Sequence, residues 1–301
     1  MMLAIEVCDL HKQYASNNVL KGIQLRVKQG EIFGFLGRNG AGKSTFIHIL
    51  TGITQPTRGS FTILGETHHH MDAIKQKIGV MPDTSNLYQH MKALEFLKYM
   101  AALKGDRRNT TELKKLLEQV GLQNVAKQKI KSFSFGMKKK ISIAQALLGD
   151  PELIFLDEPT SGLDPESAIE IQKLIVSLKD QGKTIFLTSH NLTEIEKICD
   201  TVAIMTNGLI AKIGTITQLK RAANETIRVR LRTSPSLDTS ILQQHNIQDV
   251  QFVTEEKGVS IIEVNEEEAI PLLIEQLTAA RIKVYEVNMQ VQSLEDVFMA
   301  V

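Results

Sequence analysis

The sequence predicts an α/β domain with a mostly parallel core sheet, followed by a small α+β domain. Three observations lead to this prediction. Short apolar runs alternate with amphipathic stretches through the first 214 residues. The runs at 153–157 and 184–190 are continuously apolar, as is typical of strands buried on two faces. After about residue 222 the pattern changes to short strands and helices, so we expect domains at 1–221 and 222–301.

The first domain is expected to begin with strands that lead into one strongly apolar strand and then a helix. The expected elements are strands at 4–10, 20–27, 31–37 and 60–66, and a helix at 42–52. Gly52 ends this helix, and a turn with Pro56 and Gly59 leads into the strand that follows, because glycine and proline favour such turns.

Residues 85–150 contain mostly helical patterns and interrupt the alternation of strands, so we expect a helical subdomain there. The two continuously apolar strands follow, with an amphipathic helix at 166–182 between them. Residues 201–214 are expected to form a hairpin. Its turn is expected at Asn207-Gly208, because this dipeptide readily adopts the backbone conformation of tight hairpin turns.

The second domain is expected to follow the order strand, helix, strand, strand, helix, strand. Its elements are a strand at 226–233, a helix at 239–245, a hairpin at 250–264, a helix at 267–282, a strand at 284–291 and a final helix at 293–301. Gly258 supplies the hairpin turn, and Pro271 limits where the second helix begins. This order predicts a split βαβ, ferredoxin-like fold, which by itself indicates no chemistry.

The composition is that of an average soluble globular protein. The chain has 301 residues, of which 43% are hydrophobic and 23% charged, and its formal net charge is +1. This near-neutral balance argues against a nucleic-acid partner, which would call for an excess of lysine and arginine. The two cysteines, Cys8 and Cys199, lie far apart in the sequence, which fits a reducing compartment and offers no zinc site.

We expect neither a signal peptide nor a membrane-spanning helix. Glu6 and Asp9 interrupt the short apolar stretch at the N-terminus. No apolar run approaches the roughly 20 residues that cross a bilayer, so work at a membrane would need another chain. Residues 68–70 are three consecutive histidines, whose side chains would point in different directions. We therefore expect a solvated turn there rather than a metal site.

The segment GRNGAGKST, residues 37–45, predicts a phosphate-binding loop. It matches the pattern G-x-x-x-x-G-K-[ST], and it lies between an apolar strand and a helix, as that loop requires. The glycines let the backbone curl so that its N–H groups face a phosphate. Lys43 would reach the outer phosphates, and the Ser44 hydroxyl would bind Mg²⁺. The expected binding residues are Gly37, Asn39, Gly40, Ala41, Gly42, Lys43, Ser44 and Thr45.

Acidic residues at the end of the strand at 153–157 predict the second half of this site. Asp157 is placed to hold Mg²⁺, and Glu158 could orient and deprotonate an attacking water. Without a metal, two buried carboxylates would repel one another, so a purely structural role explains this pair poorly. His190 ends the next apolar strand and could contact the γ-phosphate. A histidine at a strand end is often structural, but the sequence FLTSH around it favours a functional role.

A second potential anion site begins at Ser134, in the segment FSFGMKKKISIAQALLGDP. Ser134 can cap the N-terminus of a helix, where backbone N–H groups and the helix dipole favour an anion. Lys138, Lys139 and Lys140 would either add positive potential there or form a solvated helix face.

The segments GRNGAGKST, FSFGM, LIFLDEP, SGLD and SH occur in this order, and together they resemble the motifs of ATP-binding subunits of ABC transporters. The resemblance covers residues 1 to about 220. It implies that two such domains pack head to tail, with each ATP between the phosphate loop of one copy and the helix start at Ser134 and Gly136 of the other. ATP would hold the two copies together, and hydrolysis would let them separate.

The resemblance also implies roles for further residues. Tyr14 would stack on adenine, although its residue type also suits packing. Residues 161–164, which end at Asp164, would cross between the two nucleotide sites. Glu158 would be the catalytic base, and His190 would be the histidine that switches with the γ-phosphate.

The sequence departs from the ABC pattern at three places. Asp83 occupies the position of a glutamine that normally reaches Mg²⁺ or the attacking water and links to the membrane subunit, and we expect Asp83 still to face the metal. Phe135 and Met137 replace a glycine and a glutamine in the motif at Ser134. Arg38 occupies a position where proline is common, and we expect its side chain to point to solvent.

Residues from about 222 onward resemble, more weakly, the accessory domain of bacterial drug-exporter-like ATP-binding subunits. That domain would regulate dimerisation or assembly, or act as a passive packing module. The resemblance implies an ATPase that uses ATP and Mg²⁺ to energise export through a separate integral-membrane permease. It would act as a homodimer, or paired with a related ATPase subunit, in the cytoplasm on the inner face of the cell membrane.

Two other functions are compatible with the same motifs. One is a soluble ABC ATPase that acts on ribosomes or DNA. Such proteins usually carry two ATPase cassettes, long coiled-coil arms or zinc motifs, none of which is visible in this sequence. The other is an importer ATPase with a regulatory C-terminal domain, for which a segment of about 80 residues is small. The transported substrate is not encoded here, because it would contact the permease.

Overall fold

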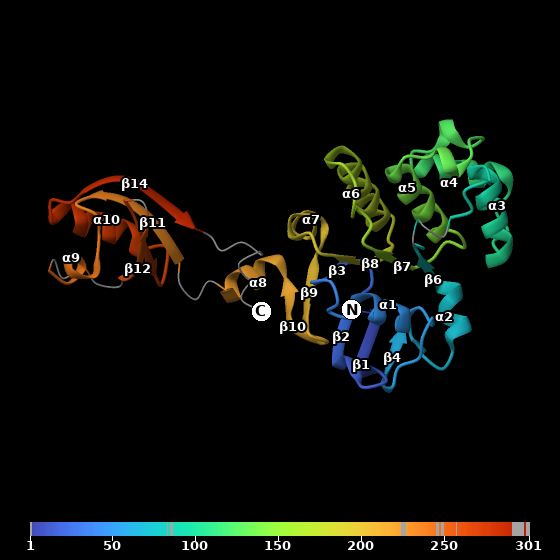
Figure 1. Ribbon diagram of the computed structural model, residues 1–301, viewed down its shortest axis with the longest axis horizontal. Helices are drawn as coiled ribbons and strands as arrows, with labels where there is room; N and C mark the ends of the chain where they lie inside the picture. Colours follow the sequence, from blue (N-terminus) through green and yellow to red (C-terminus); the bar gives the residue numbers. More distant parts are fainter. Residues whose placement is uncertain are drawn as a thin grey trace. The chain divides into compact units, whose positions relative to one another are not determined.

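The computed structural model describes residues 2–82, 84, 87–223, 227–244, 247, 250–256, 258–290 and 298. The chain divides into two compact units, Met1–Ile216 and Thr217–Val301, which are described separately (Figure 1). None of the helices within these described ranges has the length and apolar character needed to cross a membrane.

The core of the first unit is a six-stranded sheet in the order β10-β9-β3-β8-β7-β6. Its strands are β3 (Ile32–Gly37), β6 (Ile78–Val80), β7 (Leu153–Asp157), β8 (Thr184–Ser189), β9 (Thr201–Thr206) and β10 (Leu209–Thr215). All pairings are parallel except that of β10 with β9. The predicted parallel sheet is therefore confirmed. β9 and β10 form the predicted hairpin, whose turn residues Asn207 and Gly208 have φ of 52° and 82°.

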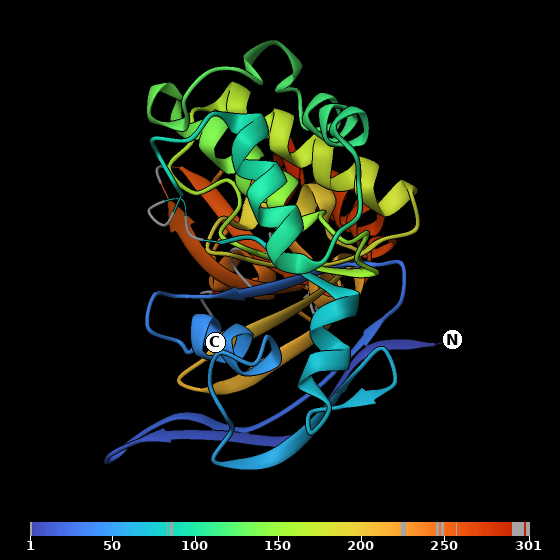
Figure 2. The ribbon, with the colours of Figure 1, turned by 90° about the vertical axis from the view of Figure 1, so that its right-hand side faces the viewer.

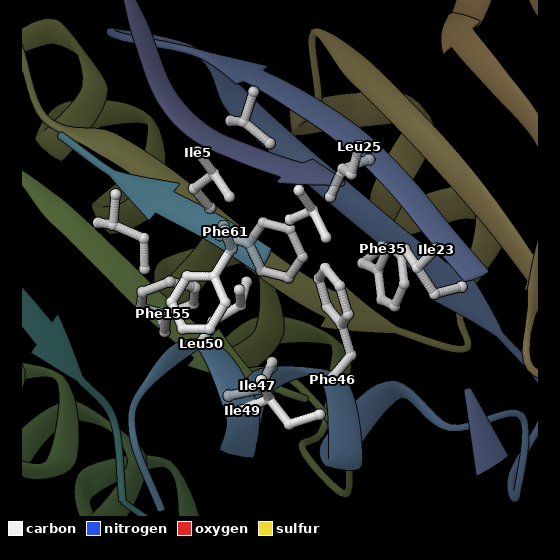
Figure 3. Packing of buried hydrophobic residues seen from close by; sticks show 14 of the residues in the cluster. Ile5, Ile23, Leu25, Phe35, Phe46, Ile47, Ile49, Leu50, Phe61 and Phe155 are labelled. Carbon is white, nitrogen blue, oxygen red and sulfur yellow. The ribbon is translucent and has the colours of Figure 1, made fainter. Parts of the chain in front are cut away.

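A second, antiparallel sheet in the order β2-β1-β4-β5 packs against one face of this core. Its strands are β1 (Leu3–Tyr14), β2 (Asn17–Lys28), β4 (Arg58–Ile63) and β5 (Glu66–Thr67). Helix α1 (Lys43–Leu50) contributes to the same hydrophobic core as both sheets (Figure 3). Phe46 of α1 stacks on Phe35 of β3, with 4.9 Å between the ring centroids. This packing holds the start of α1 directly after β3.

Helices cover the other face of the six-stranded sheet (Figure 2). Those that contact its strands are α5 (Phe135–Ala146), α6 (Pro165–Asp180) and α7 (Leu192–Ile198). In addition, α3 (Ala93–Lys104) and α4 (Thr110–Gln119) pack on α5, and short 3₁₀ helices lie at Gln123–Val125 and Ile130–Ser132. Helices α3, α4 and α5 lie within residues 85–150, where the sequence predicts mostly helical structure. Caps fix several of their starts: Asn109 and Glu112 form a capping box on α4, and Pro165 occupies the first turn of α6.

Several short elements were not expected from the sequence, two helices among them. Helix α2 (Met71–Lys77) precedes β6 and buries only Ile74, and helix α7 buries one face over seven residues. Segments this short show less than two full turns of hydrophobic periodicity, which explains why the pattern did not predict them. The three histidines lie in the turn between β5 and α2, where the His68 ring packs against Phe61 with 5.3 Å between centroids.

The second unit has a four-stranded antiparallel sheet in the order β12-β13-β11-β14. It follows α8 (Ile216–Ala223), and its elements are β11 (Ile227–Ser234), α9 (Thr239–Gln244), β12 (Val250–Glu256), β13 (Val259–Val264), α10 (Ala269–Ala279) and β14 (Lys283–Gln290). This order confirms the predicted ferredoxin-like fold, and the unit has a hydrophobic core of its own. The expected helix at 293–301 lies outside the described residues except for Phe298.

Candidate functional site

The candidate site lies at one edge of the six-stranded sheet. Strands β3, β8 and β7 are neighbours and parallel, so their carboxyl ends meet at this edge. Gly37, Asp157 and Ser189 are the last residues of these strands, and His190 follows Ser189 directly. Three segments of the chain, of which the first and the last are more than a hundred residues apart in the sequence, therefore meet at this edge.

The loop between β3 and α1 is packed tightly on its inner side and open on its outer side. Gly42, the N-cap of α1, has φ of 111°, and a Cβ there would lie 2.8 Å from Met205 Cε. A Cβ on Gly37 would lie 2.7 Å from the Met205 carbonyl oxygen. Gly40 has φ of 83° and faces open space. The glycines thus serve the close packing and the left-handed turns that place the start of α1 toward solvent.

A pocket of about 370 Å³ lies over this loop. It is lined by Val19, Asn39, Gly40, Gly42, Lys43, Ser44, Thr45, Asp157, Glu158, Ser161 and His190. Most of the predicted phosphate and catalytic residues therefore share one cavity. Gly37 and Ala41 are buried and are not among its lining residues. A larger hollow of about 740 Å³ shares Ser44, Asp157, Glu158 and Ser161 and extends past Phe135 and Lys139.

Lys43 is held inside the loop. Its side chain is 7% exposed, and its Nζ donates a hydrogen bond to the Gly37 carbonyl oxygen at 2.7 Å. The same Nζ lies 3.7 Å from Glu158 Oε1. Burying an ammonium group costs free energy unless it is paired and hydrogen-bonded, and both conditions are met here. The arrangement keeps a positive charge at the start of α1. An anionic ligand there would be stabilised by this ammonium and by the N-terminal end of the helix dipole.

Thr188 connects the two acidic residues. Its buried hydroxyl donates to Asp157 Oδ1 and accepts a hydrogen bond from the Glu158 backbone N–H at 3.0 Å. Glu158 has φ of 49°, a left-handed conformation that is uncommon for residues with a side chain. Thr188 was not predicted as part of the site, although its hydroxyl interrupts the apolar run of β8.

Glu158 and His190 contact one another directly. Glu158 Oε2 lies 2.7 Å from His190 Nδ1. With an ionised carboxylate, Nδ1 must carry the proton and donate it to this hydrogen bond. Glu158 thus lies between the charge of Lys43 on one side and the imidazole of His190 on the other. A carboxylate oriented in this way can accept a proton from a water molecule in the pocket.

Ser134, Gly136 and Asp164 occupy helix starts. Ser134 is the N-cap of α5, as predicted, and its hydroxyl accepts a hydrogen bond from the Met137 N–H at 3.2 Å. A Cβ on Gly136 would lie 3.1 Å from Ser167 Oγ. Asp164 caps α6 by accepting from the Ser167 N–H at 2.9 Å, and this bond lowers the pKa of the Asp164 carboxyl. These three residues do not line the pocket over the phosphate loop of their own chain.

Tyr14 ends β1, is 47% exposed, and does not line the phosphate-loop pocket. Its ring lies under Lys12, with Nζ 4.8 Å from the centroid. Asp83 lies outside the described residues. Arg38 is exposed, as expected.

The three consecutive lysines of α5 have different environments. Lys139 is 7% exposed, and its Nζ donates to the Glu158 carbonyl oxygen at 2.6 Å. Lys140 instead bonds to Glu170 of α6 at 2.8 Å. The expectation treated these lysines alike, either as a source of positive potential or as a solvated face. Lys139 and Lys140 both lie three or four residues from the buried Gly136 and Ile143, so helical spacing along the sequence does not distinguish them.

Glu194 is a buried carboxyl behind the site. It is 2% exposed, and its Oε2 accepts a hydrogen bond from Ser189 Oγ at 2.9 Å. Burial raises the pKa of the Glu194 carboxyl above its ordinary value of 4.5. The folded protein therefore binds this proton more strongly than the unfolded chain does, and stability falls as the pH rises above about 4.5 toward the raised pKa.

We expect Glu194→Gln to reduce this dependence on pH, because the amide keeps an acceptor for Ser189 but carries no charge. Relative to the wild type, the variant should gain thermal stability between pH 5 and pH 8. Melting temperatures of nucleotide-free protein across this range measure the effect. Glu152→Gln, at an exposed position, is the matched control. Parallel curves for wild type and Glu194→Gln would contradict the expectation.

The fold and the pocket together define a P-loop nucleotide-binding ATPase. A family model for ABC transporters matches residues 20–161, and a model for the C-terminal domain of DrrA1-3-like ATP-binding proteins matches residues 214–301. The linearmycin resistance ATP-binding protein LnrL of Bacillus subtilis (strain 168) is 35% identical over 298 residues, which cover 97% of this chain and 96% of that protein.

Two further comparisons agree with this result. The bacitracin transport ATP-binding protein BcrA of Bacillus licheniformis is 38% identical over 253 residues, which cover 83% of this chain and 82% of that protein. A solved structure of an ATP-binding subunit of an ABC transporter has a TM-score of 0.65 at 32% identity, covering 73% of this chain and 93% of that one. The chain belongs to the ABC transporter ATP-binding proteins. It binds ATP and hydrolyses it to ADP and phosphate, and subunits of this kind work with membrane permease components.

Proposed function

We propose that this protein is the ATPase subunit of an exporter and energises transport through a separate integral-membrane permease. One observation carries the proposal: a pocket lined by the phosphate-loop residues, Asp157 and Glu158 lies in a chain that is similar along nearly its whole length to an antibiotic-resistance ATP-binding protein. The relative named for bacitracin transport supports the same direction. The C-terminal unit belongs to this comparison too, because LnrL is matched across it.

In this function Glu158 is the catalytic base. Its carboxylate accepts a proton from the attacking water, and His190 orients it through the 2.7 Å contact. Lys43 and the N–H groups at the start of α1 bind the outer phosphates. Asn39, Gly40, Gly42 and Thr45 complete the loop that encloses them.

The pocket fits Mg²⁺. Ser44 and Asp157 both line it and offer the hard oxygen ligands that this ion prefers. The described residues contain no cluster of three or more histidine, cysteine, aspartate or glutamate side chains that would coordinate a metal by themselves. Phosphate and water oxygens would therefore supply the remaining ligands, as is common for Mg²⁺ bound with a nucleotide. When bound, the ion neutralises charge on the phosphates, and Asp83 is proposed to face it.

Ser134, Gly136 and Asp164 are proposed to act on the nucleotide of a second copy, or of a related ATPase subunit. This role is supported by their position outside the pocket of their own chain and by the anion-binding character of the α5 start. Tyr14 is proposed to stack on adenine at the outer side of the pocket. ATP then holds two chains together, and loss of the γ-phosphate lets them separate.

The proposed location is the cytoplasm, on the inner face of the cell membrane, where the permease would hold the protein. Affinity purification from detergent-solubilised membranes tests this location and the function together. We expect a protein with several membrane-spanning helices to co-purify with the tagged chain, and the ATPase rate of the complex to change when candidate export substrates are added. Recovery of the chain on ribosomes or DNA, or together with the substrate-binding protein of an importer, would overturn the proposal.

A further inference from the structure

Lys139 has an unusual environment for a lysine. It lies in α5, five residues after the N-cap Ser134, and its side chain is 7% exposed. Its ammonium lies 5.6 Å from the centroid of the Phe135 ring. Lysines normally keep the ammonium in water, because removing it from water costs free energy unless polar partners compensate. A buried apolar residue would avoid this cost, so the position of the charge needs a reason.

The contact with Glu158 gives that reason. Lys139 Nζ donates to the Glu158 carbonyl oxygen at 2.6 Å. The Ser161 N–H donates to the same carbonyl oxygen at a longer 3.3 Å. Glu158 is also held at its N–H, which bonds to Thr188, and at its carboxylate, which contacts His190. Thr188 and His190 lie at the end of β8, whereas Lys139 comes from α5. The base is thus held between the core sheet and the helix whose start is proposed to face a second nucleotide.

The backbone of Glu158 makes this anchoring important. Its φ of 49° is a strained conformation for a residue with a side chain, and such conformations persist when surrounding contacts hold them in place. Without the bond from Lys139, the Glu158 carbonyl keeps the longer bond from the Ser161 N–H, which holds the peptide less firmly, so the backbone is freer to relax toward a more favourable conformation. The carboxylate would then move, and a displacement of about 1 Å at a reacting group can cost roughly a hundredfold in rate.

We propose that Lys139 is a positioning residue for ATP hydrolysis. It holds the backbone of Glu158, and it connects the base of one nucleotide site to the helix start that faces the other. This inference rests on the proposed role of Glu158 as the base. Lys139 does not need to touch the nucleotide to act, because its effect passes through Glu158.

Lys139→Met tests the proposal, because methionine is unbranched and of similar length but offers no donor. We expect kcat to fall at least about tenfold, with the KM for ATP within about twofold of wild type and a similar melting temperature. Lys139→Arg should recover much of the rate, because its guanidinium can donate to the same carbonyl. Lys140→Met, which removes the neighbouring lysine and its surface bond to Glu170, is the control and should keep the wild-type rate.

A double-variant experiment separates positioning from a general structural role. In a Glu158→Gln background, Lys139→Met should cause almost no further loss of rate, because its effect requires the Glu158 carboxylate. A merely structural role would lower the residual rate of that background as well. If Lys139→Met does not fold, Lys139→Arg and Lys139→Gln carry the test. The shorter Gln should then have the lower kcat at equal KM.

Two results would overturn the proposal. One is a wild-type kcat in Lys139→Met, and the other is an equal loss with and without the Glu158 carboxylate. A wrong assignment of Glu158 as the catalytic base would give a different result. If Glu158→Gln alone hydrolyses ATP at the wild-type rate, the assignment of the base is wrong whatever Lys139 does. If Glu158→Gln is inactive and Lys139→Met is fully active, only the positioning role is wrong.

Discussion

Glu158→Gln should nearly abolish ATP hydrolysis while ATP binding is retained. The amide has the shape of the carboxylate but cannot accept a proton from water, and a positioned general base typically contributes about 10²–10⁴-fold to the rate. The change also removes a negative charge 3.7 Å from Lys43 Nζ. That charge would repel a triphosphate, so the affinity for ATP should stay level or increase.

Phosphate release measures the loss of turnover, and titration with a fluorescent ATP analogue measures the retained affinity. Analytical ultracentrifugation of the variant saturated with Mg-ATP should also show a dimer, because ATP that is not hydrolysed continues to hold the two chains together. Glu152→Gln, at an exposed position away from the pocket, should leave turnover unchanged. A wild-type rate of ATP hydrolysis in Glu158→Gln would exclude Glu158 as the catalytic base. A variant that remains monomeric with Mg-ATP, even with its permease, would contradict the proposed shared site.

Lys43→Ala should lose most of the affinity for nucleotide. The lysine places a buried ammonium at the start of α1, and hydrogen bonds to charged groups are worth about 1.5–3 kcal/mol each. Two such bonds to the outer phosphates correspond to at least about a hundredfold in Kd. Because the loop carbonyl of Gly37 and the Glu158 carboxylate would lose a partner, further weakening is expected from a less ordered loop.

Equilibrium binding of ATP and ADP to the nucleotide-free protein measures this effect. The loss should be larger for ATP than for ADP, since Lys43 is expected to reach the outermost phosphate. Lys98→Ala removes an exposed lysine from α3 and should bind both nucleotides normally. Circular dichroism and a melting curve show whether Lys43→Ala keeps its fold, and Lys43→Met serves as a second variant that preserves the buried stem. Unchanged ATP affinity in a folded variant would exclude Lys43 from phosphate binding.

Features that depend on neighbouring residues along the chain were predictable. The continuous apolar runs of β7 and β8 predicted strands of a parallel core, because both faces of such strands are buried. Ser134 was predicted as the cap of α5 because a hydroxyl directly before a helical pattern can accept from the first-turn N–H groups. The order of elements in the C-terminal unit likewise predicted its ferredoxin-like sheet.

Features that depend on contacts between distant segments were not predictable. Thr188 and Lys139 both bond to the backbone of Glu158, from positions 30 and 19 residues away along the chain. No local pattern marks Thr188 as a partner of the acidic pair, and three consecutive lysines look equivalent until a helix turns one of them inward. Glu194 is similar, since a glutamate early in a helix gives no indication of its burial behind the site.

The sequence by itself determined the chemistry that this protein can perform. The glycine spacing, the lysine and serine after it, and the acidic pair at a strand end are sufficient to indicate phosphate binding and hydrolysis. The tertiary structure decided where that chemistry occurs and what holds it. The order β3-β8-β7 brings Gly37, Glu158 and His190 to one edge, and it does so because a parallel sheet places all its carboxyl ends together.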